Sequence, residues 1–208
     1  MKKSLLSGFA ALLLIYPLTA RAGEGSIVIT HAQGNPMILR NGSSIPAKTG
    51  GACQAGDKIT TSGECTVDIA VNQTAGCRLL PSSECSIVDS SKSSMHLNVT
   101  NGNAVLNLDK LSKDTSFKLE TPTAIASVRG TQFWGRVDLQ HLENPVTTFA
   151  VRRGTVDVFA KSAGKNFSLA EGQALDIPKD ASTSPNIRPA LAGELQAMEQ
   201  ADAIKTAS

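Results

Sequence analysis

The chain has 208 residues, 20 basic and 18 acidic side chains, a formal net charge of +2 and 4% aromatic residues. So small a basic excess gives no electrostatic basis for binding nucleic acid or an anionic membrane surface. The length fits one domain with its own core, which the composition predicts to be built mainly from Val, Ile, Leu and Ala, together with a tail.

The first 22 residues have the pattern of a secretory signal peptide. Lys2-Lys3 precede an apolar run (residues 5–18), and small residues at positions 20 and 22 form a cleavage signal. The run is too short for a typical transmembrane helix. We therefore expect cleavage after Ala22 and a periplasmic or secreted protein without stable membrane insertion, with an uncleaved anchor as the alternative. Cleavage removes three basic residues and leaves 17 basic and 18 acidic side chains.

Residues 23–178 have the pattern of an all-β domain. Short stretches of alternating apolar residues recur along the chain, at 66–71, 97–108, 149–159 and 167–177. Alternation buries one face of a strand, and no strong helical period interrupts it. The pattern predicts a domain of stacked short strands, similar to a sandwich or a β-solenoid.

Glycines punctuate these stretches. Gly102, Gly154 and Gly172 each follow an alternating run, and we expect them to supply the positive φ of a turn or bulge. Asn41-Gly42 and Asn101-Gly102 are strong tight-turn signals.

The chain has four cysteines, Cys53, Cys65, Cys77 and Cys85, at spacings of 12, 12 and 8 residues. An even number of cysteines in an exported chain predicts two disulfides, with free buried thiols as the alternative. The spacing does not decide the connectivity: Cys65 with Cys85 and the pairing of sequence neighbours both remain open. No closely spaced Cys or His pair suggests a zinc site, so we expect no metal.

The segment TPTAIASVRGTQFW (121–134) is the most distinctive part of the chain. Thr121-Pro122 is expected to begin a strand, where the missing N–H of proline is tolerated. Residues 124–128 then alternate as in a strand.

The second part of this segment contains an Arg-Gly-Thr triplet. Gly130 permits an unusual backbone angle before Thr131, and we expect Arg129 to clamp adjacent turns through its guanidinium donors. Binding of an anionic ligand by Arg129 is the alternative. Trp134 is expected in the core, or else beside Arg129 and Arg136 in a site for a sugar or an acid.

Residues 179–208 differ in composition from the β region. A polar linker with prolines (179–189) precedes an Ala-rich stretch (190–205) with apolar residues near helical spacing. We expect a short C-terminal helix, which packs loosely on the β domain, mediates association or frays.

The sequence gives no support for an enzyme. It contains no G-x-S-x-G elbow, P-loop, H-E-x-x-H or G-x-G-x-x-G motif. We therefore expect neither catalysis nor a cofactor.

Several motifs occur in the order typical of FecR-type periplasmic domains: GDKITT (56–61), LNVTNGNAVLNL (97–108), TP-x5-VRGT-x-F (121–133), FAVRRGTVDVF (149–159) and LAEGQALDI (169–177). The chain resembles this family over residues 50–178, and TP-x5-VRGT-x-F is the most specific part. The resemblance implies an all-β domain of stacked strands.

The chain also departs from the family. Founding members carry a cytoplasmic anti-sigma segment and a transmembrane helix, where this chain has a signal peptide pattern; the four cysteines and the turn at 72–76 also differ from the family pattern. The anti-sigma mechanism is therefore not transferred to this chain. Together with the signal peptide pattern and the lack of catalytic motifs, the resemblance predicts a non-enzymatic periplasmic interaction or signalling module with an envelope protein partner. The alternatives are a small-ligand or glycan-binding envelope protein and a self-assembling envelope component, and homo-oligomer formation stays open.

Overall fold

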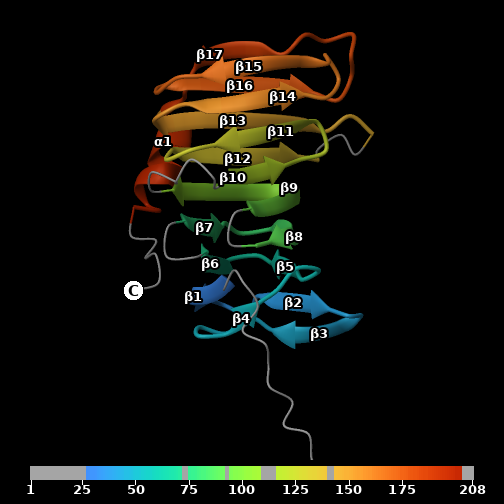
Figure 1. The fold of residues 1–208 in the computed structure, drawn as a ribbon, viewed down its shortest axis with the longest axis vertical. Helices are drawn as coiled ribbons and strands as arrows, with labels where there is room; N and C mark the ends of the chain where they lie inside the picture. The colour runs from blue at the N-terminus through green and yellow to red at the C-terminus, as the bar shows by residue number, and fades with distance from the viewer. Residues whose placement is uncertain (1–26, 72–74, 92–93, 109–115, 140–142, 203–208) are drawn as a thin grey trace, which may run out of the picture.

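The computed structural model describes residues 27–71, 75–91, 94–108, 116–139 and 143–202. The predicted signal peptide lies outside these residues. Their fold is all-β with one short C-terminal helix, as the sequence predicts (Figure 1). No helix among them is long and apolar enough to span a membrane.

The strands form two sheets, and within each sheet the strands follow one another along the long axis of the molecule (Figure 1). Sheet A has the order β4 (Ala52–Cys53), β1 (Ile27–Gln33), β6 (Thr66–Val71), β7 (Ala75–Leu79), β9 (Ser94–Leu108), β12 (Gln132–Asp138), β13 (Val146–Arg153), β16 (Gln173–Pro178), β17 (Asn186–Pro189). Sheet B has the order β3 (Ser43–Pro46), β2 (Met37–Arg40), β5 (Lys58–Thr61), β8 (Ser83–Ser90), β9, β10 (Ser116–Glu120), β11 (Ala124–Val128), β14 (Val156–Ala160), β15 (Lys165–Leu169). All pairs are antiparallel except β9–β10, which is parallel.

The main hydrophobic core lies between the two sheets. The predicted alternation places its apolar residues there, as with Val67, Ile69 and Val71 of β6, which are all buried. Burial of this face is the main stabilising contribution to the fold, since each fully buried aliphatic side chain contributes about 1.5–3 kcal/mol.

Strand β9 belongs to both sheets. Residues 95–101 pair in sheet B and residues 102–108 pair in sheet A. Gly102, with φ +81°, lies at the change of sheet, and a Cβ there would come within 2.4 Å of the Ser83 Oγ. The prediction of a tight turn at Asn101-Gly102 is therefore wrong, because the positive φ bends one continuous strand instead of reversing it.

Other turn predictions have mixed outcomes. Asn41-Gly42, with φ angles of 50° and 78°, forms the β2–β3 hairpin turn as predicted. Thr121-Pro122 does not begin a strand but forms the turn between β10 and β11. The Thr121 hydroxyl accepts a hydrogen bond from the Ala124 N–H (3.1 Å), so the threonine stabilises a turn that the sequence does not distinguish from a strand start.

The C-terminal residues pack on the domain. Strand β17 lies within the segment predicted as a linker and pairs with β16 at the edge of sheet A. Helix α1 (Ala192–Glu199) lies within the predicted helical stretch and covers the outer face of sheet A, where it contacts β9, β12 and β13 (Figure 1).

Candidate functional site

Two Arg-Gly-Thr corners carry the chain between the sheets. Residues 129–131 connect β11 of sheet B to β12 of sheet A, and residues 153–155 connect β13 of sheet A to β14 of sheet B. Gly130 and Gly154 have φ angles of +74° and +87°, which a side chain rarely adopts. The corners touch, since a Cβ on Gly154 would lie 2.9 Å from the Thr131 Cγ2 and 3.1 Å from the Gly130 carbonyl oxygen.

The Thr131 side chain is buried in the first corner. The backbone carbonyl oxygen of Thr131 accepts a hydrogen bond from the Leu108 N–H (2.9 Å). Close backbone approach therefore fixes the corners. Arg129 does not act as the predicted clamp: its side chain is exposed, and it makes no hydrogen bond or ion pair with any residue that the structure describes.

Arg129 instead lines a shallow basin of about 600 Å3 on the sheet B side of the corners. Lys118, Ser127 and Asp157 are successive cross-strand neighbours on β10, β11 and β14 and lie along one wall of the basin. Two cationic side chains and one carboxylate give the basin a net positive charge. It can therefore accept an acidic group from a partner.

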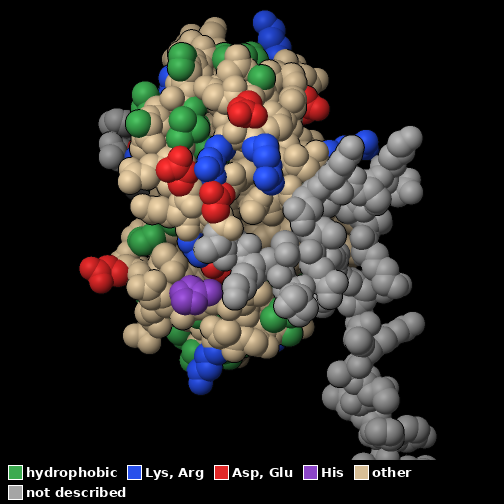
Figure 2. Space-filling model, turned by 90° about the vertical axis from the view of Figure 1, so that its left-hand side faces the viewer, with side chains coloured by type: hydrophobic (Ala, Val, Ile, Leu, Met, Phe, Trp, Pro, Cys, Tyr) green, Lys and Arg blue, Asp and Glu red, His purple; other side chains and the backbone are tan. Residues whose placement is uncertain are grey.

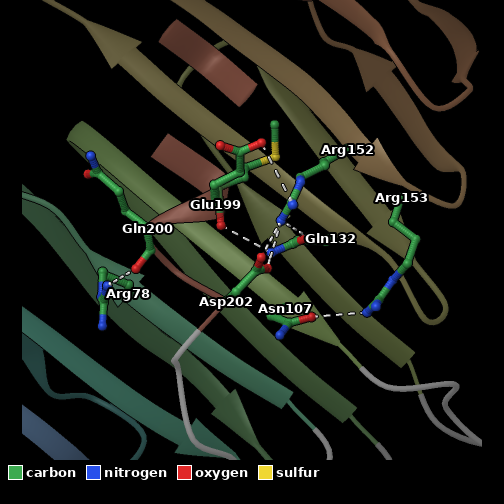
Figure 3. Close-up of polar contacts among 9 residues, drawn as sticks. Arg78, Asn107, Gln132, Arg152, Arg153, Glu199, Gln200 and Asp202 are labelled. Carbon is green, nitrogen blue, oxygen red and sulfur yellow. Dashed lines mark hydrogen bonds and ion pairs between the residues drawn. The ribbon is translucent and has the colours of Figure 1, made fainter. Parts of the chain in front are cut away.

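On the sheet A side, the corners are flanked by residues that bind the end of α1 (Figure 3). Gln132 is buried directly after the first corner and donates from Nε2 to the Asp202 Oδ1 (2.6 Å) and to the Met198 carbonyl oxygen (3.2 Å). Arg152 lies just before the second corner and donates from Nη1 to both Asp202 carboxylate oxygens at 2.7 Å. The hydrogen bonds from Arg152, followed by that from Gln132, lower the pKa of the Asp202 carboxyl.

Two more arginines hold α1. Arg78 donates to the Gln200 carbonyl oxygen (2.6 Å). At the other end of the helix, the Arg188 guanidinium joins Asp176 of β16 to Glu194 of α1, with N–O distances of 2.7 and 2.6 Å. Figure 2, which views the molecule from the α1 side, shows acidic and basic side chains next to each other on this face. The sequence pattern did not single out these residues.

Trp134 lies beneath α1 and is 7% exposed. It packs in a second apolar cluster on the outer face of sheet A with Val105, Ala150, Ala174 and Met198. Its Nε1 has no hydrogen-bond partner among the described residues.

This position agrees with the expectation that Trp134 is part of a core. The alternative sugar or acid site is not assembled, because Trp134 is covered, Arg136 pairs with Asp138 (2.6 Å), and Arg129 lines the basin on the sheet B side.

The prediction of two disulfides is not met, because Cys53, Cys65, Cys77 and Cys85 are all buried free thiols. Three of them occupy positions of the apolar core. Cys53, Cys77 and Cys85 have Ile27, Ile69 and Ile59 as cross-strand neighbours. These three cysteines pack among the aliphatic residues as small hydrophobic side chains. The spacing of cysteines in the sequence does not distinguish such core positions from disulfide partners.

Burial raises the pKa of the Cys53 and Cys85 thiols to about 12 and raises that of Cys77 as well. Cys65 differs, because hydrogen bonds from the Ser62 hydroxyl and the Asn35 N–H lower the pKa of its thiol.

A buried ion pair supports the Gly-Asp element of the sequence. The Asp57 carboxylate is fully buried and accepts hydrogen bonds from Arg40 Nε (2.7 Å), Arg40 Nη2 (2.6 Å) and the Gln54 N–H (2.9 Å). This links β2 to the start of β5. Asp57 therefore has a structural role. The one sequence feature that points to this role is its position after Gly56, just before a strand.

The comparisons agree with this fold. The family model described as FecR protein matches residues 57–157, which include both corners. Two crystal structures of a candidate anti-sigma factor from Parabacteroides distasonis ATCC 8503 share the fold, with TM-scores of 0.58 and 0.57 at 14% sequence identity. Each alignment covers 69% of this chain and 64% of the other, so the chain spans less than two thirds of that protein.

No curated protein matches the chain in sequence. The family match, the two Arg-Gly-Thr corners and the shared two-sheet fold agree with one another. The chain therefore contains a FecR-type domain, which the family model places at residues 57–157.

Proposed function

We propose that this chain is an exported, non-enzymatic FecR-domain protein that acts in the periplasm as a protein-interaction module in signalling. The signal peptide pattern supports export. The FecR family match and the likeness to a candidate anti-sigma factor support a regulatory role through a partner protein.

The observation that carries this proposal is the exposed guanidinium of Arg129, which lines the basin and has no partner among the residues that the structure describes. Val128 and Thr131, on either side of the Arg129-Gly130 pair, are buried, so the backbone of the first corner is anchored at both ends. The planar guanidinium of Arg129 can bind a carboxylate in a bidentate geometry. Lys118 on the same basin adds a second cation for an acidic partner segment.

The small-ligand alternative has less support. Sites for small molecules enclose most of the ligand surface, whereas the charged side chains of this basin are exposed. The aromatic side chain on which a glycan site would depend, Trp134, is covered by α1.

The proposal is tested with the full-length chain at native expression level. A photoreactive amino acid replaces Ser127, an exposed residue of the basin, so that Arg129 is retained. A control carries it at Ser44, an exposed residue of β3 at the other end of the stack. We expect a defined protein adduct from position 127 in the periplasmic fraction, loss of this adduct when Arg129→Ala is added, no such adduct from position 44, and an N-terminus that begins at Gly23. The absence of an adduct from position 127, or identical adducts from positions 127 and 44, would contradict the proposal.

A further inference from the structure

We propose that the outer face of sheet A beneath α1 is a docking surface for a helix of a partner protein, and that α1 occupies this surface as an internal substitute. The surface, called the helix dock below, consists of Val105, Trp134, Ala150 and Ala174 together with the polar side chains of Arg78, Gln132 and Arg152. This inference rests on the proposed function and specifies where a partner binds.

The apolar part of the helix dock faces away from the main core. Outward positions of an antiparallel sheet are usually polar when they face water. Here Val105, Ala150 and Ala174 are fully buried, and Met198 and Ala201 of the α1 segment cover them. The small side chains at 150 and 174 let a helix approach the sheet closely.

The polar side chains of the helix dock bind the C-terminal end of the helix. Gln132 is 3% exposed and uses its amide to bind a backbone carbonyl of the helix and the carboxylate that follows it. Arg152 binds the same carboxylate through both oxygens, and Arg78 binds the next free carbonyl. Free carbonyls are a feature of a helix C-terminus, so the dock is complementary to that element and, in addition, to a carboxylate that follows it.

The helix dock and its cover come from different parts of the chain. The FecR family match spans residues 57–157 and contains every residue of the dock except Ala174, whereas α1 lies at residues 192–199. The dock is thus built on the family domain, and its cover lies outside the matched region.

Helix α1 is a weak helix by itself. It has eight residues, and its N-cap residue, Leu191, has no polar side chain; only the Glu194 carboxylate closes the first turn, by accepting a hydrogen bond from the Leu191 N–H (2.7 Å). Isolated helices of this length are marginal in water, so α1 depends on the dock for its structure. A partner helix with the same features can therefore compete with it.

The short connection between β17 and α1 argues for a partner helix instead of an exchanged α1 from a second copy. Only residues 190 and 191 separate Pro189 from Ala192, so α1 cannot reach another molecule unless β17 leaves its sheet. The partner we infer carries a short helix with Met or Leu and Ala on one face, followed by a carboxylate, as at Met198, Ala201 and Asp202.

The test uses full-length protein and a fluorescent peptide of residues 190–202 as the probe. Asp202→Arg and, separately, Met198→Asp loosen α1, the first by placing a cation against Arg152 and the second by placing a charge in the apolar cluster. We expect each variant to bind the peptide at least about tenfold more tightly than the unmodified chain, because the competing internal helix is weakened. Adding Arg152→Glu to Asp202→Arg should reverse the gain, because it restores an internal ion pair of opposite polarity and also removes the partner of the peptide's own Asp202.

The result that overturns the inference is equal binding, or no binding, by the unmodified chain and by an Asp202→Arg variant whose circular dichroism and melting temperature are retained. Met198→Asp is the more disruptive change, so the decision rests on Asp202→Arg, whose side chain is 54% exposed in the native protein. Peptide binding without an adduct from position 127 would support the helix dock and contradict the proposed function of the basin. An adduct from position 127 without peptide binding would support the basin and contradict the helix dock.

Discussion

Gly154 and Thr131 are in contact where the two Arg-Gly-Thr corners meet, with the ideal Cβ position of Gly154 2.9 Å from the Thr131 Cγ2. We predict that Gly154→Ala lowers the free energy of unfolding by about 2–4 kcal/mol, since it adds a steric overlap to the cost of a positive φ. Denaturant unfolding measures this change.

Gly172→Ala is the matched control. Gly172 has a similar φ of +78°, but a Cβ there meets no atom within 4 Å. Its substitution should cost only about 1–2 kcal/mol, the strain of the backbone conformation alone. Equal losses for the two variants would show that contact between the corners does not contribute to stability.

Asp57→Asn should destabilise the chain by roughly 3 kcal/mol, because it leaves the Arg40 guanidinium beside a buried neutral group. The control is Asp157→Asn, an exposed site with no hydrogen bond to a described residue, for which we expect a change within about 0.5 kcal/mol. Chemical denaturation of both variants checks the difference, and a loss at position 57 as small as that at position 157 would refute the structural role of the pair.

The native chain should contain four free thiols, counted by thiol titration in denaturant without reductant. In the folded protein Cys65 should react first with an alkylating reagent. Its pKa is lowered whereas the pKa values of the other three thiols are raised, so at a given pH a larger fraction of Cys65 is thiolate. Mass mapping of the labelled sites checks the order. Two intact disulfides, or equal labelling of Cys65 and Cys77, would contradict these assignments.

Acid should release α1. The pKa of Asp202 is lowered below its reference value of 3.8 by Arg152 and Gln132, so its contribution to docking is present above pH 3.8 and is lost as the pH falls through the lowered pKa. Trp134, the chain's single tryptophan, lies under α1 and reports release by its fluorescence. Asp202→Asn should remove this step while circular dichroism shows the sheets unchanged; a step that persists in Asp202→Asn would assign it to another group.

Much of the fold could be predicted from the sequence because the alternation of apolar residues is a local pattern. The runs at 66–71 and 149–159 fall on β6 and on β13–β14, and Gly154 has the expected positive φ. The same signal fails where a glycine redirects a strand without reversing it, as at Gly102. Whether such a glycine forms a turn or bends one continuous strand depends on where the second sheet lies, and the local sequence does not indicate this.

The candidate site was predicted less well because its contacts are distant in sequence. Gln132 binds Asp202 and Arg78 binds Gln200, across separations of 70 and 122 residues. Nothing in the spacing of these residues indicates the contact. Arg129 shows another case, since the motif drew attention to it and predicted a structural role, but the fold gives that role to Gly130, Thr131 and Gly154.

Hydrogen exchange of the α1 amides in the native protein tests the helix dock most directly. If α1 is a replaceable occupant, its amides, such as Leu195 and Gln200, should exchange through a local opening while β12 and β13 remain protected. Exchange of α1 only together with the sheets, with the same denaturant dependence, would show that the helix is a fixed part of the domain and contradict the account.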